Sequence, residues 1–173
     1  MILSSDIYLK DPLWERVLNE LCAKNELGIF NRLVDVYVLA CAIGIKEDKI
    51  ISESDITNPL ATPKQIGRNT HRENDDIRDL LDSMLQNALL HSKTIDFDDD
   101  ERLKLAFNPD YVNKKIRADD FLTGFANYGI HEIYGIISSH SSLVALSDLY
   151  EYFESLSNDR YDDLLKTLTL EDI

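Results

Sequence analysis

The feature that most constrains the fold is the run "GIFNRLVDVYVLACAIGI", residues 28–45, in which Arg32 and Asp35 are the only charged residues. A helix with apolar side chains on nearly every side has no face suited to water, so it should be buried all round. We therefore expect it at the centre of the core, or at the centre of a dimer. Asn31 can cap its start, and Gly44 can end it. Asp35 then lies near the helix start, where the macrodipole favours an anion, or pairs with Arg32.

An amphipathic helix is predicted near the start of the chain. Asp11 can cap free backbone N–H groups, and Pro12 at the first helical position loses no hydrogen bond. Before it, Ile7 and Leu9 alternate in "SSDIYLK", which is compatible with a short strand or an extended arm. One face of the helix carries the apolar residues Leu13, Trp14, Val17, Leu18, Leu21 and Cys22.

A second amphipathic helix is predicted after residue 70. The sequence from Thr70 to Glu73 matches the capping box S/T-x-x-E, and the helix should end by His91 and Ser92. Its apolar stripe consists of Ile77, Leu80, Leu81, Met84, Leu85, Ala88 and Leu89, and its acidic face of Asp75, Asp76, Asp79 and Asp82.

The second half of the chain predicts a succession of further helices. One starts at Asn108 and Pro109, which form a cap and a first helical residue. The others are a helix from Asp119 to Gly129, a short helix over Ile130 to Ile137, and two helices capped by Ser142 and Asn158. No long alternating or β-branched run indicates an extended sheet.

Residues 46–70 are predicted to be a long connecting loop. Asn58-Pro59 and Thr62-Pro63 interrupt this stretch, and the residue before a proline is biased away from the helical conformation. A short strand is expected around Lys49 to Ser52. Long loops inside compact domains are uncommon and often functional, which makes this loop a first candidate for a working segment.

The fold class that follows is mainly α. With 173 residues, 44% apolar and 29% charged, the chain suits a globular protein with one core. We predict a single compact helical domain over residues 1–173, of about six to eight helices, with one short strand or hairpin near the N-terminus or within residues 46–70. The longest apolar run, Val36 to Ile45, is too short to span a membrane, and the N-terminus lacks the pattern of a signal peptide.

An acidic stretch, "TIDFDDDERLKL", contributes to a net charge of −14. It fails as an EF-hand loop, because Glu101 stands where glycine is needed and Phe107 where the bidentate glutamate is needed. Acids crowded on one polar segment also share one environment, which does not suit general acid–base catalysis. We expect one of Asp98 to Asp100 to cap a short helix. The candidate acidic face for a basic partner is Asp96, Asp98, Asp99, Asp100 and Glu101.

Two short basic clusters are the only local features that favour nucleic-acid binding. The overall negative charge opposes the phosphate backbone, so any contact with DNA would be weak and local. The candidate basic patch consists of Lys64, Arg68, Arg72, Lys114, Lys115 and Arg117.

No motif in the sequence indicates catalysis, a metal or a cofactor. "SSHSS", residues 138–142, lacks a nucleophile elbow and an acid to orient the histidine, and reads as a polar turn. Nucleotide-binding glycine motifs are absent. Cys22 and Cys41 lie in apolar helical patterns, which favours core packing in a reducing cytoplasm. His71, His91, His131 and His140 show no metal-ligand spacing. We expect a protein that is not an enzyme, located in the cytoplasm.

Part of the chain resembles small accessory proteins of bacterial DNA phosphorothioation (Dnd) systems. The core motif of that family has matches at Phe30, Asp35, Val36, Val38, Ala40, Ala42, Gly44 and Ile45. The flanking segments "DIYLKDPLWERVLNEL" and "FANYGIHEIYGII" also resemble the family. The resemblance implies a cytoplasmic accessory protein of a DNA-modification and antiphage defence system. It implies no catalytic residues.

Three functions follow as alternatives. The first is an interaction protein of such a defence system, which binds a protein partner through the acidic face or the loop 46–70. The second is a DNA-associated module resembling a ribbon-helix-helix arrangement, with "DIYLK" as the ribbon. The third is an acidic DNA mimic or anti-restriction inhibitor, in which carboxylates imitate phosphates. A homodimer is compatible with the apolar helix of residues 28–45.

Overall fold

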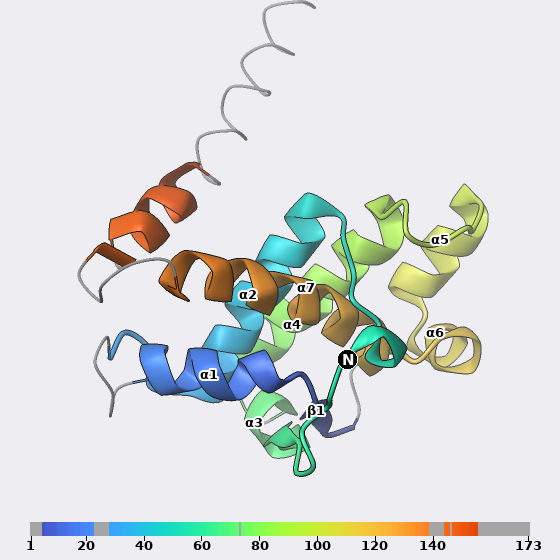
Figure 1. Ribbon diagram of the computed structural model, residues 1–173. Coiled ribbons are helices and arrows are strands. Elements are labelled where there is room, and N and C mark those ends of the chain that lie inside the picture. The colour runs from blue at the N-terminus through green and yellow to red at the C-terminus, as the bar shows by residue number, and fades with distance from the viewer. Residues whose placement is uncertain (1–4, 23–27, 73, 139–143, 146, 156–173) are drawn as a thin grey trace, which may run out of the picture. The chain divides into compact units, whose positions relative to one another are not determined.

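The computed structural model is mainly helical, with a small two-stranded antiparallel sheet near the N-terminus (Figure 1), which confirms the predicted fold class. The structure describes residues 5–22, 28–72, 74–138, 144–145 and 147–155. The chain divides into two compact units, Met1–Tyr134 and Gly135–Ile173. The expectation of a single domain over the whole chain stays a prediction.

Helices and two short strands follow one another along the chain. They are β1 (Ile7–Leu9), α1 (Pro12–Leu21), α2 (Leu33–Glu47), the 3-10 helix η1 (Glu53–Asp55), β2 (Lys64–Ile66), α3 (Arg68–Arg72), α4 (Asp75–His91), α5 (Asp99–Phe107), α6 (Pro109–Lys115) and α7 (Ala118–Ser138). In the second unit, residues 144–145 and 147–155 are also helical. The caps predicted at Ser142 and Asn158 lie outside the described residues.

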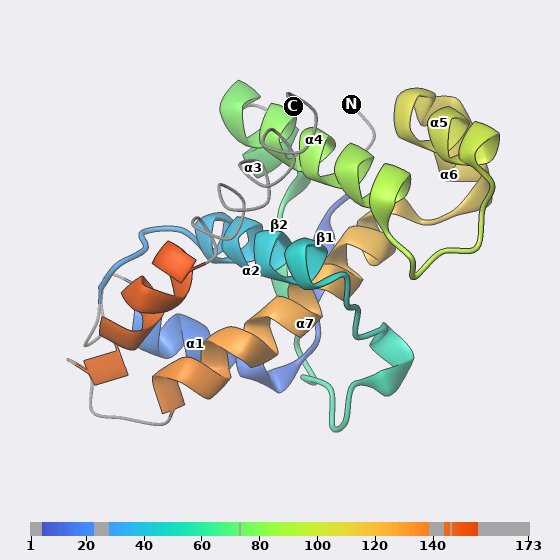
Figure 2. The same ribbon diagram turned by 90° about the horizontal axis from the view of Figure 1, so that it is seen from above.

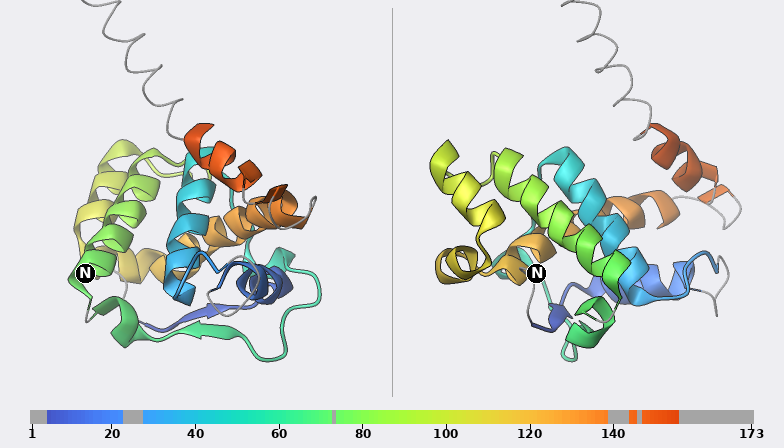
Figure 3. Two further views of the ribbon diagram at one scale, coloured as in Figure 1. Left: turned by 90° about the vertical axis from the view of Figure 1, so that its left-hand side faces the viewer. Right: turned by 180° about the vertical axis from the view of Figure 1, so that it is seen from behind.

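The apolar helix α2 forms the centre of the first unit. Figures 2 and 3 show it between α4 on one side and α7 on the other. Its buried residues are Val34, Val36, Tyr37, Ala40, Cys41, Ile43 and Gly44. Burial raises the pKa of Tyr37 and of Cys41, so both side chains are protonated and neutral at physiological pH. The predicted place of this helix in the core is therefore confirmed.

Two glycines that the sequence assigns to helix ends lie inside helices instead. The prediction that Gly44 ends its helix is wrong, because α2 continues to Glu47. The prediction that Gly129 ends a helix is also wrong, because α7 is continuous from Ala118 to Ser138 and includes the segment predicted as a separate short helix. The physical reason is that α2 and α7 cross at these glycines, where the backbones of the two helices are in direct contact and leave no room for a side chain. A Cβ on Gly44 would lie 2.1 Å from the carbonyl oxygen of Phe125.

Three predicted helix starts are confirmed by their caps. The Asp11 carboxylate accepts a hydrogen bond from the backbone N–H of Leu13 at 2.9 Å, and Pro12 is the first residue of α1. The Asn108 side chain accepts from the N–H of Tyr111 at 3.1 Å at the start of α6. At the start of α5, the Asp98 side chain accepts from the N–H of Glu101.

Two other predicted caps are wrong. At α2 the N-cap is Arg32 rather than Asn31, and its side chain makes no capping hydrogen bond. At α4 the cap is Asn74, whose side chain accepts from the N–H of Ile77 at 3.2 Å, rather than the box that starts at Thr70. Thr70 instead lies within the short helix α3, which leaves no free helix start at that position.

The strand predicted near the N-terminus is β1, and its partner comes from the loop of residues 46–70. β1 pairs with β2 in antiparallel register, with Ile7 opposite Ile66 and Leu9 opposite Lys64. The strand expected around Lys49 to Ser52 is absent from that segment, which makes other contacts. Because β1 finds its partner within the chain, the pairing counts against a ribbon shared between two copies.

Candidate interaction surface

The acidic stretch forms the start of α5. The carboxylate of Asp98 accepts a hydrogen bond from the backbone N–H of Glu101 at 2.8 Å, which confirms the predicted cap. Asp99 and Asp100 occupy the first turn, where the helix dipole stabilises negative charge. Asp96, Asp98, Asp99 and Asp100 are all exposed. Four of the five predicted acidic residues therefore face solvent at one end of one helix.

Glu101 differs from the other four because α6 engages it. Its Oε1 accepts a hydrogen bond from the Tyr111 hydroxyl at 3.0 Å and lies 3.3 Å from the Nζ of Lys115. The hydrogen bond to Glu101 raises the pKa of Lys115, with the nearby Tyr111 hydroxyl adding to the effect. Glu101 thus joins α5 to α6 and contributes less to an accessible acidic face.

The side chain of Arg102 fixes the segment that precedes α5. Its guanidinium donates to the carbonyl oxygens of Ser92 at 2.8 Å, Ile95 at 2.7 Å and Phe97 at 2.9 Å. It also donates to the carbonyl of Leu89, in the last turn of α4, at 3.2 Å. An Arg side chain suits this position because its planar fork presents several donors at once. The acidic stretch is therefore held against α4, which packs beside α5 (Figure 3).

The outward face of α5 carries two large apolar side chains next to the acids. Leu103 is 51% exposed and Phe107 is 62% exposed. The two residues are four positions apart, so they lie on one face of the helix, while Leu105 is buried on the opposite side. The α5 surface, defined as Asp99, Asp100, Leu103 and Phe107, is acidic at its start and apolar at its end.

The first cluster of the predicted basic patch is partly neutralised. Lys64 lies in β2, and its ammonium is 3.0 Å from a carboxylate oxygen of Glu15 on α1. Arg68 begins α3 with an exposed side chain, and its backbone N–H donates to Asp6 at 2.7 Å. The side chain of Arg72 lies outside the described residues. Of the two cations with described side chains, Lys64 is therefore already paired with a carboxylate.

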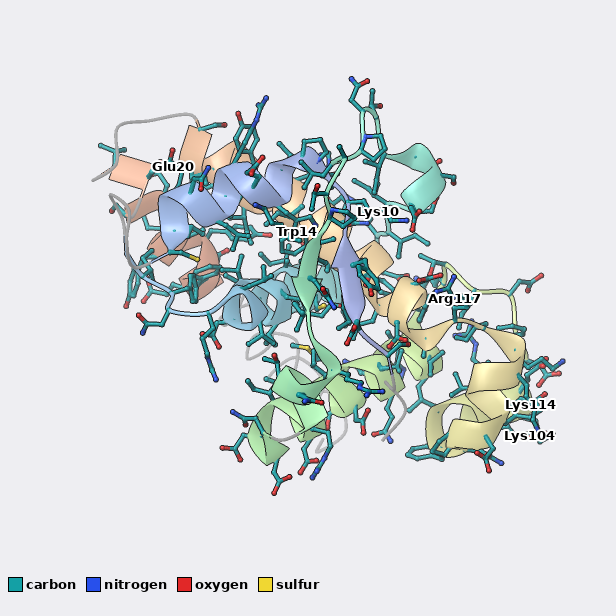
Figure 4. All side chains as sticks on the ribbon, turned by 90° about the horizontal axis from the view of Figure 1, so that it is seen from below. Lys10, Trp14, Glu20, Lys104, Lys114 and Arg117 are labelled. Carbon is teal, nitrogen blue, oxygen red and sulfur yellow. The ribbon has the colours of Figure 1, made fainter. Side chains whose placement is uncertain are left out.

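The second cluster lies at the end of α6 and the start of α7. Lys115 pairs with Glu101, as above, and Arg117 lies 3.1 Å from the carboxylate of Asp120. In Figure 4, Lys114 is seen on the α5 and α6 pair and Arg117 where α7 begins. A phosphate would have to compete with carboxylates for two of the three cations, which counts against a strong DNA contact.

Among the described residues of the first unit, the carboxylates also do not form one phosphate-like row. These acids are distributed over α1, α2, η1, α4, α5, α6 and α7, and many pair with cations of the same chain. Arg78, for example, lies 2.7 Å from Asp75 and 3.0 Å from Asp79, and Arg32 binds the two carboxylate oxygens of Asp35. A DNA mimic needs free carboxylates along one face, so this distribution counts against that alternative.

The residues that sequence reasoning missed are Arg102, Leu103 and Phe107. Leu103 and Phe107 are four positions apart, and this spacing was a visible signal, but only the fold shows that they face outward. Arg102 follows an acidic run and resembles an ordinary surface charge in the sequence.

Among the residues with described side chains, no group of His, Cys, Asp or Glu could hold a metal ion. Within the described ranges, no helix is long and apolar enough to cross a membrane.

The fold and the α5 surface define a helical protein with a small antiparallel sheet and a partly apolar, acidic helix face. Comparison with known proteins adds no closer assignment, because no family model, no curated protein and no solved structure matches the chain.

The role of Asp98 as a cap can be separated from its charge. Asp98→Ala is expected to lower the free energy of unfolding by about 1 kcal/mol, because the N–H of Glu101 loses its partner. Asp99→Ala removes the same charge from the next residue, without a capping bond, and should cost roughly half as much or less. Urea unfolding of both variants measures the difference. Equal losses would show that Asp98 acts only through its charge.

Proposed function

We propose that this chain is a non-enzymatic interaction protein, a cytoplasmic accessory component of a DNA-modification or antiphage defence system, which binds a protein partner through the α5 surface. The observation that carries the proposal is the exposure of Leu103 and Phe107 on one face of α5, next to exposed Asp99 and Asp100. Apolar side chains that emerge beside unpaired charges are typical of docking sites, at which burial supplies affinity and charge supplies orientation.

The chemistry of the partner follows from the same surface. Burial of Leu103 and Phe107 requires an apolar complement, and the acids at the start of the helix require a basic one. A partner segment that carries Lys or Arg next to large apolar side chains satisfies both. The α5 surface is also preorganised, because Arg102, the Asp98 cap and the Glu101 to Lys115 pair hold the helix in place. Less ordering cost then opposes binding.

The apolar part of the proposal is tested with the product of each gene adjacent to the gene for this chain. The two proteins are purified, and their affinity is measured by isothermal titration calorimetry. The double variant Leu103→Ser with Phe107→Ser should weaken binding at least about tenfold, because the buried apolar anchors are lost. Leu80→Ser is the matched control, since Leu80 is an apolar residue of α4 that is 44% exposed. It should change affinity less than about threefold.

The acidic part is tested by kinetics. The double variant Asp99→Asn with Asp100→Asn should slow association and flatten its dependence on salt, because it removes the charges that steer a basic partner. The double variant Asp76→Asn with Glu20→Gln, at exposed acids of α4 and α1, removes the same number of charges and serves as the control for net charge. The proposal fails if no adjacent gene product binds. It also fails if a product binds but neither double variant changes its affinity or its association rate.

A further inference from the structure

A cavity of about 310 Å³ opens in the first unit, between the end of β1, the segment around η1 and one face of α7. Tyr8 and Lys10 line it from the side of β1, and Glu53 from η1. Asp120 and Asn127 line it from α7. Its volume is at the small end of the range of ligand pockets, which suits a compact molecule. None of these residues belongs to the α5 surface.

The walls of the cavity are fixed by hydrogen bonds on both sides of η1. Before η1, the carbonyl of Ile51 accepts from the amide of Asn127 at 3.3 Å, and the Asn127 oxygen accepts from the indole N–H of Trp14 at 3.1 Å. After η1, the backbone N–H of Leu60 donates to the carbonyl of Lys10 at 2.7 Å. Asn127 is almost completely buried. The cavity is therefore preformed, and the part of the loop beside it is anchored.

The charges at the cavity come as one cation and two carboxylates. Lys10 forms an ion pair with Glu53 across the opening, and Asp120 pairs with Arg117 at 3.1 Å on the outer side. A ligand with only a negative charge would take Lys10 and leave Glu53 without a partner. A ligand with only a positive charge would have to share Glu53 with Lys10. A ligand with both charges can separate Lys10 from Glu53 and give each a new partner.

Hydroxyl groups supply the uncharged polar contacts. Ser52 and Ser54 line the cavity and share a hydrogen bond of 2.7 Å, and Ser52 also donates to Asp55. Thr123 lines the floor, with its hydroxyl 3.2 Å from that of Tyr37. Each hydroxyl keeps acceptor capacity, because a hydroxyl oxygen has two lone pairs. Together they can accept the remaining hydrogens of a ligand ammonium group.

We propose that this cavity binds a free α-amino acid as its zwitterion. The ligand carboxylate binds the ammonium of Lys10, and the ligand ammonium binds Glu53 and Asp120. The ring of Tyr8, which is half exposed at the opening, and the side chain of Ile56 contact the ligand side chain. The activity is binding alone, with no covalent step, and it is separate from the partner binding proposed above.

The proposal is tested with the standard L-amino acids, first by thermal denaturation of the full chain and then by isothermal titration calorimetry. At least one amino acid should raise the midpoint and bind with a stoichiometry of one. The amine that lacks its carboxyl group and the acid that lacks its amino group should each bind at least about tenfold more weakly, because hydrogen bonds between charged groups are lost.

Two variants with matched controls locate the site. Lys10→Gln and Asp120→Asn should each weaken binding at least about tenfold. Lys114→Gln and Glu20→Gln remove the same charges at exposed positions of α6 and α1 outside the cavity lining and should leave binding unchanged (Figure 4). Asp120 is exposed, so Asp120→Asn tests the site even if Lys10→Gln does not fold. The proposal is overturned if no amino acid binds at millimolar concentration, if the decarboxylated amine binds as well as its amino acid, or if neither variant weakens binding.

Discussion

Replacement of Gly44 or of Gly129 by alanine is expected to destabilise the protein strongly, because each adds a methyl group where α2 and α7 cross. An alanine Cβ at Gly44 would lie 2.1 Å from the carbonyl oxygen of Phe125, and one at Gly129 would lie 2.0 Å from that of Ala40. Both contacts are with backbone, so no side chain can move aside, and the helices α2 and α7 would have to separate. The expected loss is about 3 kcal/mol of unfolding free energy for each variant.

Thermal and urea unfolding measure this loss, which corresponds to a decrease in melting temperature of roughly 6 to 12 °C for a chain of this size. Gly135→Ala is the matched control, because Gly135 lies in the same helix as Gly129 but has no atom within 4 Å of an added Cβ. Alanine is the better helix former, so this control should be neutral or up to about 1 kcal/mol more stable. Equal effects at Gly129 and Gly135 would contradict the close crossing of α2 and α7.

Local signals in the sequence predicted three helix starts, although the caps expected at Asn31 and Thr70 were wrong. Asp11 with Pro12, Asn108 with Pro109, and Asp98 each start a helix where expected, because a cap is satisfied by backbone groups two or three residues away. The burial of α2 was also predictable, since its apolar residues leave no face for water. These features depend on neighbours in sequence and on composition, which a single chain displays.

Features that depend on packing between distant elements were mispredicted. A glycine that ends a helix and a glycine that admits another helix look alike in sequence, and Gly44 and Gly129 prove to be of the second kind. The strand β2 could not be recognised within a proline-rich connection, because its partner strand, Ile7 to Leu9, is distant in the sequence. Its three residues are too few to show an alternating pattern of their own.

The sequence predicts the acidic residues of the candidate site but not its apolar residues. The five acids were recognised as one segment, yet the fold removes Glu101 from it through Tyr111 and Lys115. The basic cluster near residue 115 looks in the sequence like a separate patch, whereas Lys115 pairs with Glu101 of the acidic segment. The apolar half of the α5 surface could not be foreseen, because the sequence does not show which face of a short helix packs on α4.

Substitution of Arg102 by methionine should cost about 2 to 3 kcal/mol, because several carbonyl oxygens lose their donor at once. Methionine keeps much of the unbranched stem of the side chain and removes the charge and all the N–H groups. The carbonyls of Ser92, Ile95 and Phe97 belong to the segment that connects α4 to α5, and they have to turn toward water when the guanidinium is absent. Urea unfolding measures the loss.

A local readout distinguishes this role of Arg102 from general destabilisation. Under native conditions, the backbone amides of Lys93 and Thr94, which donate to Asp48 and Ser92, should exchange with solvent faster in Arg102→Met, while those within α2 change less. Lys104→Met removes a cation from the exposed side of the same helix and should stay within about 0.5 kcal/mol of the parent protein. Arg102→Lys should recover only part of the loss, because an ammonium group cannot span carbonyls that a planar fork reaches together. Full recovery by lysine would mean that the charge of residue 102, rather than the geometry of its hydrogen bonds, holds α5 in place.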